Sequence, residues 1–274
     1  MFGSTTLFRR STVLIFLLVL LSLALAVVVS AQSSPEEVAA AIIAAENSND
    51  VDAAVALFAD DAVVTLADGS TFDTPEGIRG WQQALADGHF RLEPINVTAD
   101  GNMVTWTGTI SLDAFRHLGI ASMAGNWSLD IEDGKINTFD FTFTPEAFTE
   151  LQAGATAAAL IAAEAAHDVD GAAALFADDA VVTLADGSVY DTPEGIRGWQ
   201  QALADGNFRI EPEGISVDGN TVSWMGEISL DAFRGLGIPV MGGIWKLTIE
   251  DGKVKTFNFS FTPAALEALT AATS

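Results

Sequence analysis

One stretch of this chain occurs twice, and this repeat limits the fold more than any other feature of the sequence. The segment from Phe58 to Ser70 (FADDAVVTLADGS) returns letter for letter from Phe176 to Ser188, and Asp73 to Gly88 returns as Asp191 to Gly206. Both pairs are offset by 118 residues, from 58 to 176 and from 73 to 191. Solenoid repeats have units of about 20–50 residues, so this period is too long for a solenoid. It is the length of a domain, and the sequence therefore predicts two consecutive copies of one fold.

The first 31 residues have the pattern of an export signal. Arg9 and Arg10 precede an apolar run from Val13 to Val29, and small residues follow up to Ala31. A basic start, an apolar stretch and a small-x-Ala site are the parts of a secretory signal peptide. The run exceeds the usual apolar core of about 7–15 residues, so an uncleaved anchor at residues 13–29 is the alternative. In both cases we expect the domains outside the cytoplasm, secreted or periplasmic, with membrane contact only if the segment is retained.

Composition excludes several classes of function. The chain has no cysteine, which excludes thiol catalysis, thiolate metal sites and disulfides. Its net charge is −25, and losing Arg9 and Arg10 with the signal would change it to −27. Such an acidic protein repels nucleic acid, so we expect no nucleic-acid partner. The acidic residues match no calcium-loop spacing, and we expect neither a metal site nor another cofactor.

The first half of each copy has the pattern of helices around one strand. In the first copy, Pro35 to Glu46 and Asp50 to Phe58 have helical spacing of apolar residues. The β-branched run from Ala62 to Leu66 predicts a strand, and Asp68-Gly69 predicts a hairpin turn. A third helix is expected from Pro75 to Leu85, because proline favours the first helical position.

The second half of each copy has a β pattern. Four strands are expected at Phe90 to Thr98, Met103 to Ile110, Gly125 to Ile131 and Ile136 to Phe143. A short helical stretch is expected between the second and third strands, from Leu112 to Leu118. Pro145 to Gln152 predicts a short exit helix, and Gly154 is the expected break before the second copy. The predicted fold class is α+β, with the helices on one face of a curved antiparallel sheet, in domains at residues 35–152 and 154–270.

The helix-to-strand segment of each copy is similar to a known family. Leu57 to Val64 (LFADDAVV), then Asp68-Gly69, then Pro75 to Trp81 (PEGIRGW), resembles the SnoaL-like branch of the nuclear transport factor 2-like superfamily. The turn from Glu132 to Ile136 (EDGKI) agrees, and the resemblance covers residues 36–150 and 154–270. It implies two cone-shaped domains, each a strongly curved sheet wrapped on about three helices. This fold hosts isomerases, cyclases, hydrolases and many proteins that are not enzymes, so the resemblance alone assigns no function.

The resemblance also shows which catalytic groups are missing. The catalytic aspartate of the ketosteroid isomerase branch corresponds to Leu66 and Leu184. Its oxyanion tyrosine falls near Ile42 and Leu160, and its second acid falls at or next to Trp127 and Trp245. Base and oxyanion donors are both absent, so that activity is not expected here.

Strand alternation predicts an aromatic interior with no titratable group deep inside it. Because general acid–base catalysis needs a positioned proton carrier, we expect a ligand pocket without catalysis. The candidate ligand-binding residues are Leu66, Trp81, Gln82, Trp106, Phe115, Arg116, Trp127 and Phe139, with Leu184, Trp199, Gln200, Trp224, Phe233, Arg234, Trp245 and Phe257 in the second copy. The alternative is that these rings fill the core completely.

Polar candidates lie elsewhere. Asp113 and Arg116 lie on the short helical insert, and they recur as Asp231 and Arg234. Each pair is expected to be a surface ion pair. The alternative is a lid whose arginine receives an anionic group. Asp140 becomes Asn258 and is expected on the outer face of its strand. Relatives of this fold pair sheet to sheet, so the resemblance implies an intramolecular pseudo-dimer through Thr138, Asp140, Thr142, Thr256, Asn258 and Ser260.

Together these features predict an exported tandem protein that binds a small apolar or aromatic molecule in one or both cones without catalysis. A SnoaL-like lyase, isomerase or cyclase using Asp113 with Arg116, or Asp140, is the alternative. A purely structural or interaction module is the third hypothesis.

Overall fold

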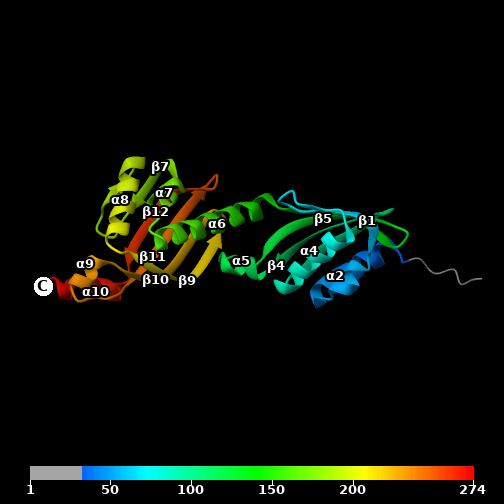
Figure 1. Ribbon diagram of the computed structural model, residues 1–274, viewed down its shortest axis with the longest axis horizontal. Helices are drawn as coiled ribbons and strands as arrows, with labels where there is room; N and C mark the ends of the chain where they lie inside the picture. Colours follow the sequence, from blue (N-terminus) through cyan, green and yellow to red (C-terminus); the bar gives the residue numbers. More distant parts are fainter. Residues whose placement is uncertain (1–32) are drawn as a thin grey trace, which may run out of the picture.

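The computed structural model describes residues 33–274 and contains two α+β domains, one after the other along an elongated molecule (Figure 1). The two domains contain separate six-stranded sheets, as the 118-residue repeat predicts. The signal segment or anchor predicted at residues 1–31 lies outside the described residues. Between residues 33 and 274, no helix is long and apolar enough to cross a membrane.

The first domain follows the predicted order of helices and strands. Its elements are α2 Pro35–Ser48, α3 Val51–Val55, β1 Phe58–Thr65, β2 Thr71–Phe72, α4 Pro75–Asp87, β3 Arg91–Asp100, β4 Met103–Ser111, α5 Asp113–His117, β5 Met123–Glu132 and β6 Lys135–Phe143. The helices begin where side chains cap their free N–H groups: Ser34 and Glu37 form a capping box, and Thr74 Oγ1 accepts from Gly77 N at 3.1 Å. Two predicted boundaries were wrong, because α3 ends at Val55 and not at Phe58, and β1 begins at Phe58 and not at Ala62.

The second domain repeats this order. Its elements are α6 Pro145–Ala165, α7 Val169–Ala174, β7 Phe176–Thr183, β8 Val189–Tyr190, α8 Pro193–Asp205, β9 Arg209–Asp218, β10 Thr221–Ser229, α9 Asp231–Gly235, β11 Met241–Glu250, β12 Lys253–Phe261 and α10 Pro263–Ala272. Corresponding strands have corresponding partners, since Trp106 pairs with Trp127 and Trp224 with Trp245.

Each sheet is mixed and not purely antiparallel. The strand orders are β2-β1-β6-β5-β4-β3 and β8-β7-β12-β11-β10-β9. The β1–β6 and β7–β12 pairs are parallel, whereas the other neighbours are antiparallel. The chain reaches β6 only after the long excursion through α4 and four strands, β2 to β5, which permits a parallel pair that a short hairpin cannot form.

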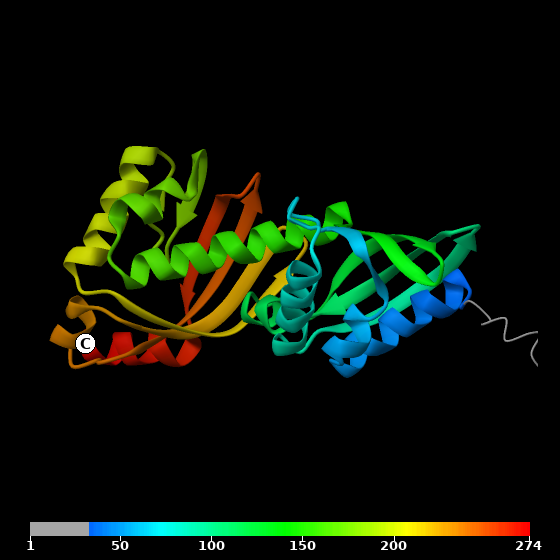
Figure 2. The same cartoon turned by 45° about the vertical axis from the view of Figure 1, so that its right-hand side comes forward.

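The helix α6 belongs to both domains, and Figure 2 shows it passing from the first domain across the sheet of the second. The predicted break at Gly154 is therefore wrong. A Cβ on Gly154 would lie 3.0 Å from the carbonyl oxygen of Leu118, so glycine here allows close packing of α6. Ala147 contributes to the first core, and Ala157 and Leu160 contribute to the second.

A second contact between the domains involves the loop after α5. Val217 N, on β9, donates a hydrogen bond of 3.3 Å to the carbonyl oxygen of Gly119. The sheet residues expected to pair the domains, Asp140, Thr142, Asn258 and Ser260, are exposed, and Thr138 and Thr256 are only partly buried. Within residues 33–274, the domains are thus joined by α6 and the Gly119 loop, and the expected face-to-face pairing of the two sheets is not seen.

Candidate ligand pockets

Each domain contains an apolar cavity between its helices and the concave face of its sheet. The cavity volumes are about 350 Å³ in the first domain and about 370 Å³ in the second. These volumes suit a small organic molecule. The alternative of a completely filled aromatic core therefore does not describe either domain.

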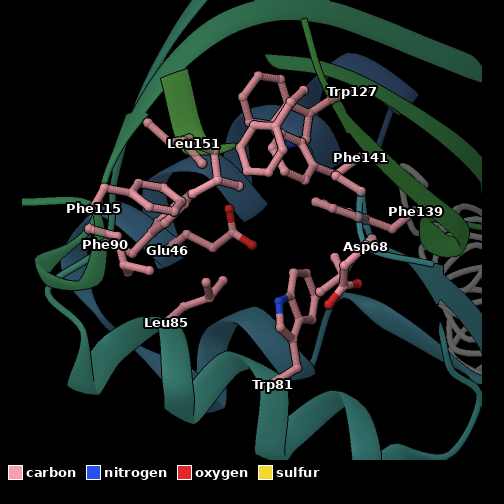
Figure 3. Close-up of a pocket in the computed structure, with 15 residues that line it drawn as sticks. Glu46, Asp68, Trp81, Leu85, Phe90, Phe115, Trp127, Phe139, Phe141 and Leu151 are labelled. Carbon is pink, nitrogen blue, oxygen red and sulfur yellow. The ribbon is translucent and has the colours of Figure 1, made fainter. Parts of the chain in front are cut away.

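Aromatic rings from helices α4 and α5 and from strands β5 and β6 contribute to the walls of the first cavity (Figure 3). Trp127 of β5 packs on Phe141 of β6 with ring centroids 4.8 Å apart, and Trp81 of α4 meets Phe139 edge-on at 5.1 Å. In the second cavity the matching separations, from Trp245 to Phe259 and from Trp199 to Phe257, are 5.0 and 5.1 Å. The two cavities are copies in their aromatic geometry as well as in their sequence.

A glutamate reaches into each of these apolar spaces. Val38, Ile42 and Glu46 are spaced four residues apart, so they lie on one face of α2. Only 5% of the surface of Glu46 is exposed. Figure 3 shows its carboxyl group directed into the cavity among the rings. The Oε1 atom of Glu46 accepts a hydrogen bond of 2.9 Å from Nε2 of the buried Gln82. In the second domain Gln200 donates to Glu164 at 2.8 Å.

Burial changes the acidity of both glutamates. Removal from water raises the pKa of Glu46 from 4.5 to about 7, and the hydrogen bond from Gln82 offsets only part of this effect. Burial raises the pKa of Glu164 to about 7 in the same way. Among the residues lining the two cavities there is no lysine, arginine or histidine. Each carboxyl group therefore has no counter-ion in its own cavity.

The expectation of an interior without titratable groups is wrong because of these two glutamates. A signal was present in the sequence: α2 and the aligned residues 153–166 are identical at seven of fourteen positions, and Glu46, which matches Glu164, is the only acid among the seven. The other acids of α2, Glu36 and Glu37, are replaced by Gly154 and Ala155. Of the three acids of α2, only the one at an apolar helical position is retained, and this retention is the signal that marks the site.

The structure brings most of the sequence-predicted residues to the cavity walls. Those that line the cavities are Leu66, Trp81, Phe115, Trp127 and Phe139 in the first domain, and Leu184, Trp199, Phe233, Trp245 and Phe257 in the second. Gln82 and Gln200 contact the cavities through the glutamates that they bond. The lining residues that the structure adds in the first domain include Glu46, Asp68, Leu85 and Leu151.

Trp106 and Trp224 lie behind the walls. Trp106 stacks on Trp127 with centroids 5.8 Å apart and planes 9° apart, and Trp224 stacks on Trp245 at 5.6 Å. Both are 3% exposed, and neither lines a cavity. Their indole Nε1 groups have no hydrogen-bond partner within the part of the chain that the structure describes. These two rings support the cavity wall without forming it.

Arg116 and Arg234 do not line the cavities. Arg116 forms an exposed ion pair with Asp113, as Arg234 does with Asp231. The pKa of Asp113 is lowered by its hydrogen bond with His89 and then by the one with Arg116. This geometry agrees with the surface ion pair. Asp140 is exposed on the outer face, as strand alternation predicted.

Comparison with known proteins agrees with this architecture. The model of a family described as SnoaL-like domain matches residues 39–139 and, a second time, residues 157–257. The chain belongs to the SnoaL-like domain family. Both copies are SnoaL-like domains, which confirms the predicted tandem duplication and the nuclear transport factor 2-like fold.

Solved structures similar to this SnoaL-like chain each match about one domain. A putative polyketide cyclase from Sinorhizobium meliloti is 26% identical, covers 38% of this chain and 93% of its own, and has a TM-score of 0.35. The epoxide hydrolase/cyclase-like enzyme SalBIII is 16% identical over 42% of this chain and 95% of its own, with a TM-score of 0.39. A putative ketosteroid isomerase from Kribbella flavida is 19% identical over 42% and 82%, with a TM-score of 0.37. No curated protein matches the chain.

Proposed function

We propose that this tandem SnoaL-like protein binds a small apolar or aromatic molecule in each cavity, with Glu46 and Glu164 as polar anchors. The observation that carries the proposal is an apolar cavity of about 350 Å³ with a single buried carboxyl group directed into it. Ligand sites have this composition, because apolar walls supply affinity and a few polar groups fix the orientation of the ligand. Both domains contain an apolar cavity with a buried glutamate.

The positions of the acids support the proposal of binding without catalysis. Asp113 with Arg116, and Asp140, were the sequence-based candidates for chemistry, and they lie on the exposed surface. In the cavity itself, the family positions for base and oxyanion donor carry Leu66 and Trp127, which are apolar walls. A substrate in the cavity would meet the carboxyl groups of Glu46 and Asp68 and no basic side chain on these walls.

Proton transfer at Glu46 is the second candidate function. A carboxyl group with a pKa of about 7 can both accept and donate a proton near neutral pH, as a general acid–base catalyst must. This observation favours a lyase, isomerase or cyclase. Turnover that Glu46→Gln and Glu164→Gln abolish while ligand binding persists would establish it over binding alone.

Export is part of the proposal. It is supported by Arg9, Arg10, the apolar run from Val13 to Val29 and the small residues up to Ala31. A secreted or periplasmic protein beginning at Gln32 is the expected product when the full chain is expressed. Intact mass and N-terminal sequencing of the exported fraction test this, and a membrane-bound product that retains Arg9 would show an anchor.

The binding proposal is tested with N-phenyl-1-naphthylamine, a neutral fluorescent probe of apolar sites. Leu85 and Leu203 line the two cavities, so Leu85→Trp with Leu203→Trp should fill them and abolish the fluorescence increase. Ala84→Trp is the matched control, because Ala84 is the exposed neighbour of Leu85 on α4. Absence of binding to the unmodified protein, or equal binding to the filled variant, would contradict the proposal and favour a structural or interaction role.

A further inference from the structure

We propose that the ligand of each cavity is an organic ammonium cation, held by the carboxylate of Glu46 or Glu164 and by the faces of the surrounding aromatic rings. This inference rests on the proposed binding function and names the chemical class of the ligand.

The charged groups at the cavities have one sign only. In the first domain they are Glu46 and Asp68, and in the second they are Glu164 and Asp186. No basic side chain lines either cavity, so a negative potential inside is not compensated by the protein. An anionic ligand would be repelled, whereas a cation would supply the missing counter-ion.

The walls suit a cation as well as an apolar group. Trp81, Trp127, Phe139 and Phe141 surround the space into which Glu46 points (Figure 3). The face of an aromatic ring is the negative part of its quadrupole, and it attracts a cation within about 6 Å of the ring centroid. Methylated and other substituted ammonium groups suit such sites, because their surface is apolar while their charge is positive.

The hydrogen bonding of the glutamate leaves it open to a ligand. Within residues 33–274, the Glu46 carboxyl group accepts one hydrogen bond, from Gln82 to Oε1, and Oε2 has no protein partner. Glu164 has the same arrangement with Gln200. A buried carboxylate that lacks both a counter-ion and a second hydrogen bond costs free energy, which a bound cation would recover.

The affinity of a permanent cation should rise with pH over the range in which Glu46 ionises. The elements around Glu46 present few charged groups. Gln82 on α4 is neutral, and β4, β5, β6, α5 and α6 present apolar side chains to the cavity. The hairpin after β1 presents Asp68. Hydrogen bonds from Ser70 lower the pKa of Asp68, so Asp68 stays ionised above pH 5. Glu46 is then the group that titrates.

The experiment compares choline with 3,3-dimethyl-1-butanol, its neutral isostere, as displacers of N-phenyl-1-naphthylamine. We expect choline to bind at least about tenfold more tightly than the alcohol at pH 8. Its affinity should fall about 50- to 100-fold between pH 8 and pH 5, while that of the alcohol stays constant. Glu46→Gln with Glu164→Gln should remove both the preference and the pH dependence, whereas Asp140→Asn, which copies the natural Asn258, should leave both unchanged.

The outcomes separate this inference from the binding proposal. If the fluorescent probe binds and the alcohol displaces it as well as choline does, or choline does not displace it, the ligand is not a cation and the binding function stands. A preference for choline that persists unchanged in the double glutamine variant also overturns the inference, because the glutamates would then not be the counter-ions. If the fluorescent probe itself does not bind, the binding function fails, and the cation inference fails with it.

Discussion

At the scale of single residues, the buried carboxyl of Glu46 should make stability depend on pH. Its pKa is about 7 in the folded protein and near the ordinary 4.5 in the unfolded chain, so the folded state holds the proton to higher pH. The stabilisation is therefore complete below about pH 4.5 and is lost as pH rises through 7. We expect a loss of about 2–3 kcal/mol per glutamate between pH 5 and pH 8.

Urea denaturation at pH 5 and pH 8 checks this prediction. Glu46→Gln should flatten the pH dependence contributed by the first domain, because the amide cannot ionise. Asp140→Asn serves as the control, since Asp140 is exposed and its loss should leave the pH dependence unchanged. Equal pH dependence in the unmodified protein and in Glu46→Gln would show that the carboxyl is not sequestered from water.

The two stacked tryptophans of each domain should differ in how much stability they contribute. Trp106 is packed behind the wall, so Trp106→Ala should cost about 3–5 kcal/mol. Trp127 faces the cavity on one side and already lacks neighbours there, so Trp127→Ala should cost less, about 2–3 kcal/mol, and should alter probe binding. Denaturant unfolding measures the loss of stability, and titration with the fluorescent probe measures the change in binding. The same two measurements on Trp224→Ala and Trp245→Ala repeat the comparison in the second domain. A large loss for Trp127→Ala with unchanged probe binding would contradict the pocket.

At the scale of elements, three helical glycines should respond to substitution in opposite directions. Gly80 of α4 and Gly198 of α8 have no atom within 4 Å of an added Cβ, so Gly80→Ala and Gly198→Ala should each stabilise by about 0.5–1 kcal/mol. Gly154 of α6 packs against Leu118, so the larger side chain of Gly154→Val should destabilise the protein by about 1–3 kcal/mol, although glycine itself is unfavourable inside a helix. Thermal unfolding measures all three. Stabilisation by Gly154→Val would show that α6 does not pack closely at this point.

At the scale of the whole molecule, the continuous helix α6 should set the distance between the domains. Inserting Gly-Gly-Ser after Gln152 would interrupt α6 between its contacts with the two cores. We expect a broader distribution of domain separations, measured by small-angle X-ray scattering. The same insertion after Gly101, in an exposed turn of the first domain, is the control and should leave the distribution unchanged. An unchanged distribution in the α6 variant would mean that the Gly119 contact alone holds the domains.

The sequence by itself determined the features that depend on local pattern. The 118-residue offset specified two copies, the Asp68-Gly69 pair specified a hairpin, and alternation placed Phe139 inside and Asp140 outside. These properties follow from backbone geometry and from neighbours close along the chain, so each can be derived without knowing the rest of the fold.

Only the tertiary structure decided the features that depend on distant neighbours. Helical spacing places Glu46 beside Ile42, but its isolation from water requires α4 and the concave sheet to close around it. Gly154 reads locally as a break, yet α6 continues through it, and Gly154 packs against Leu118, 36 residues earlier. Whether the aromatic rings left a cavity was likewise set by the curvature of a whole sheet. The burial and packing of a side chain depend on contacts with residues far apart in the sequence, so a local sequence pattern cannot predict them.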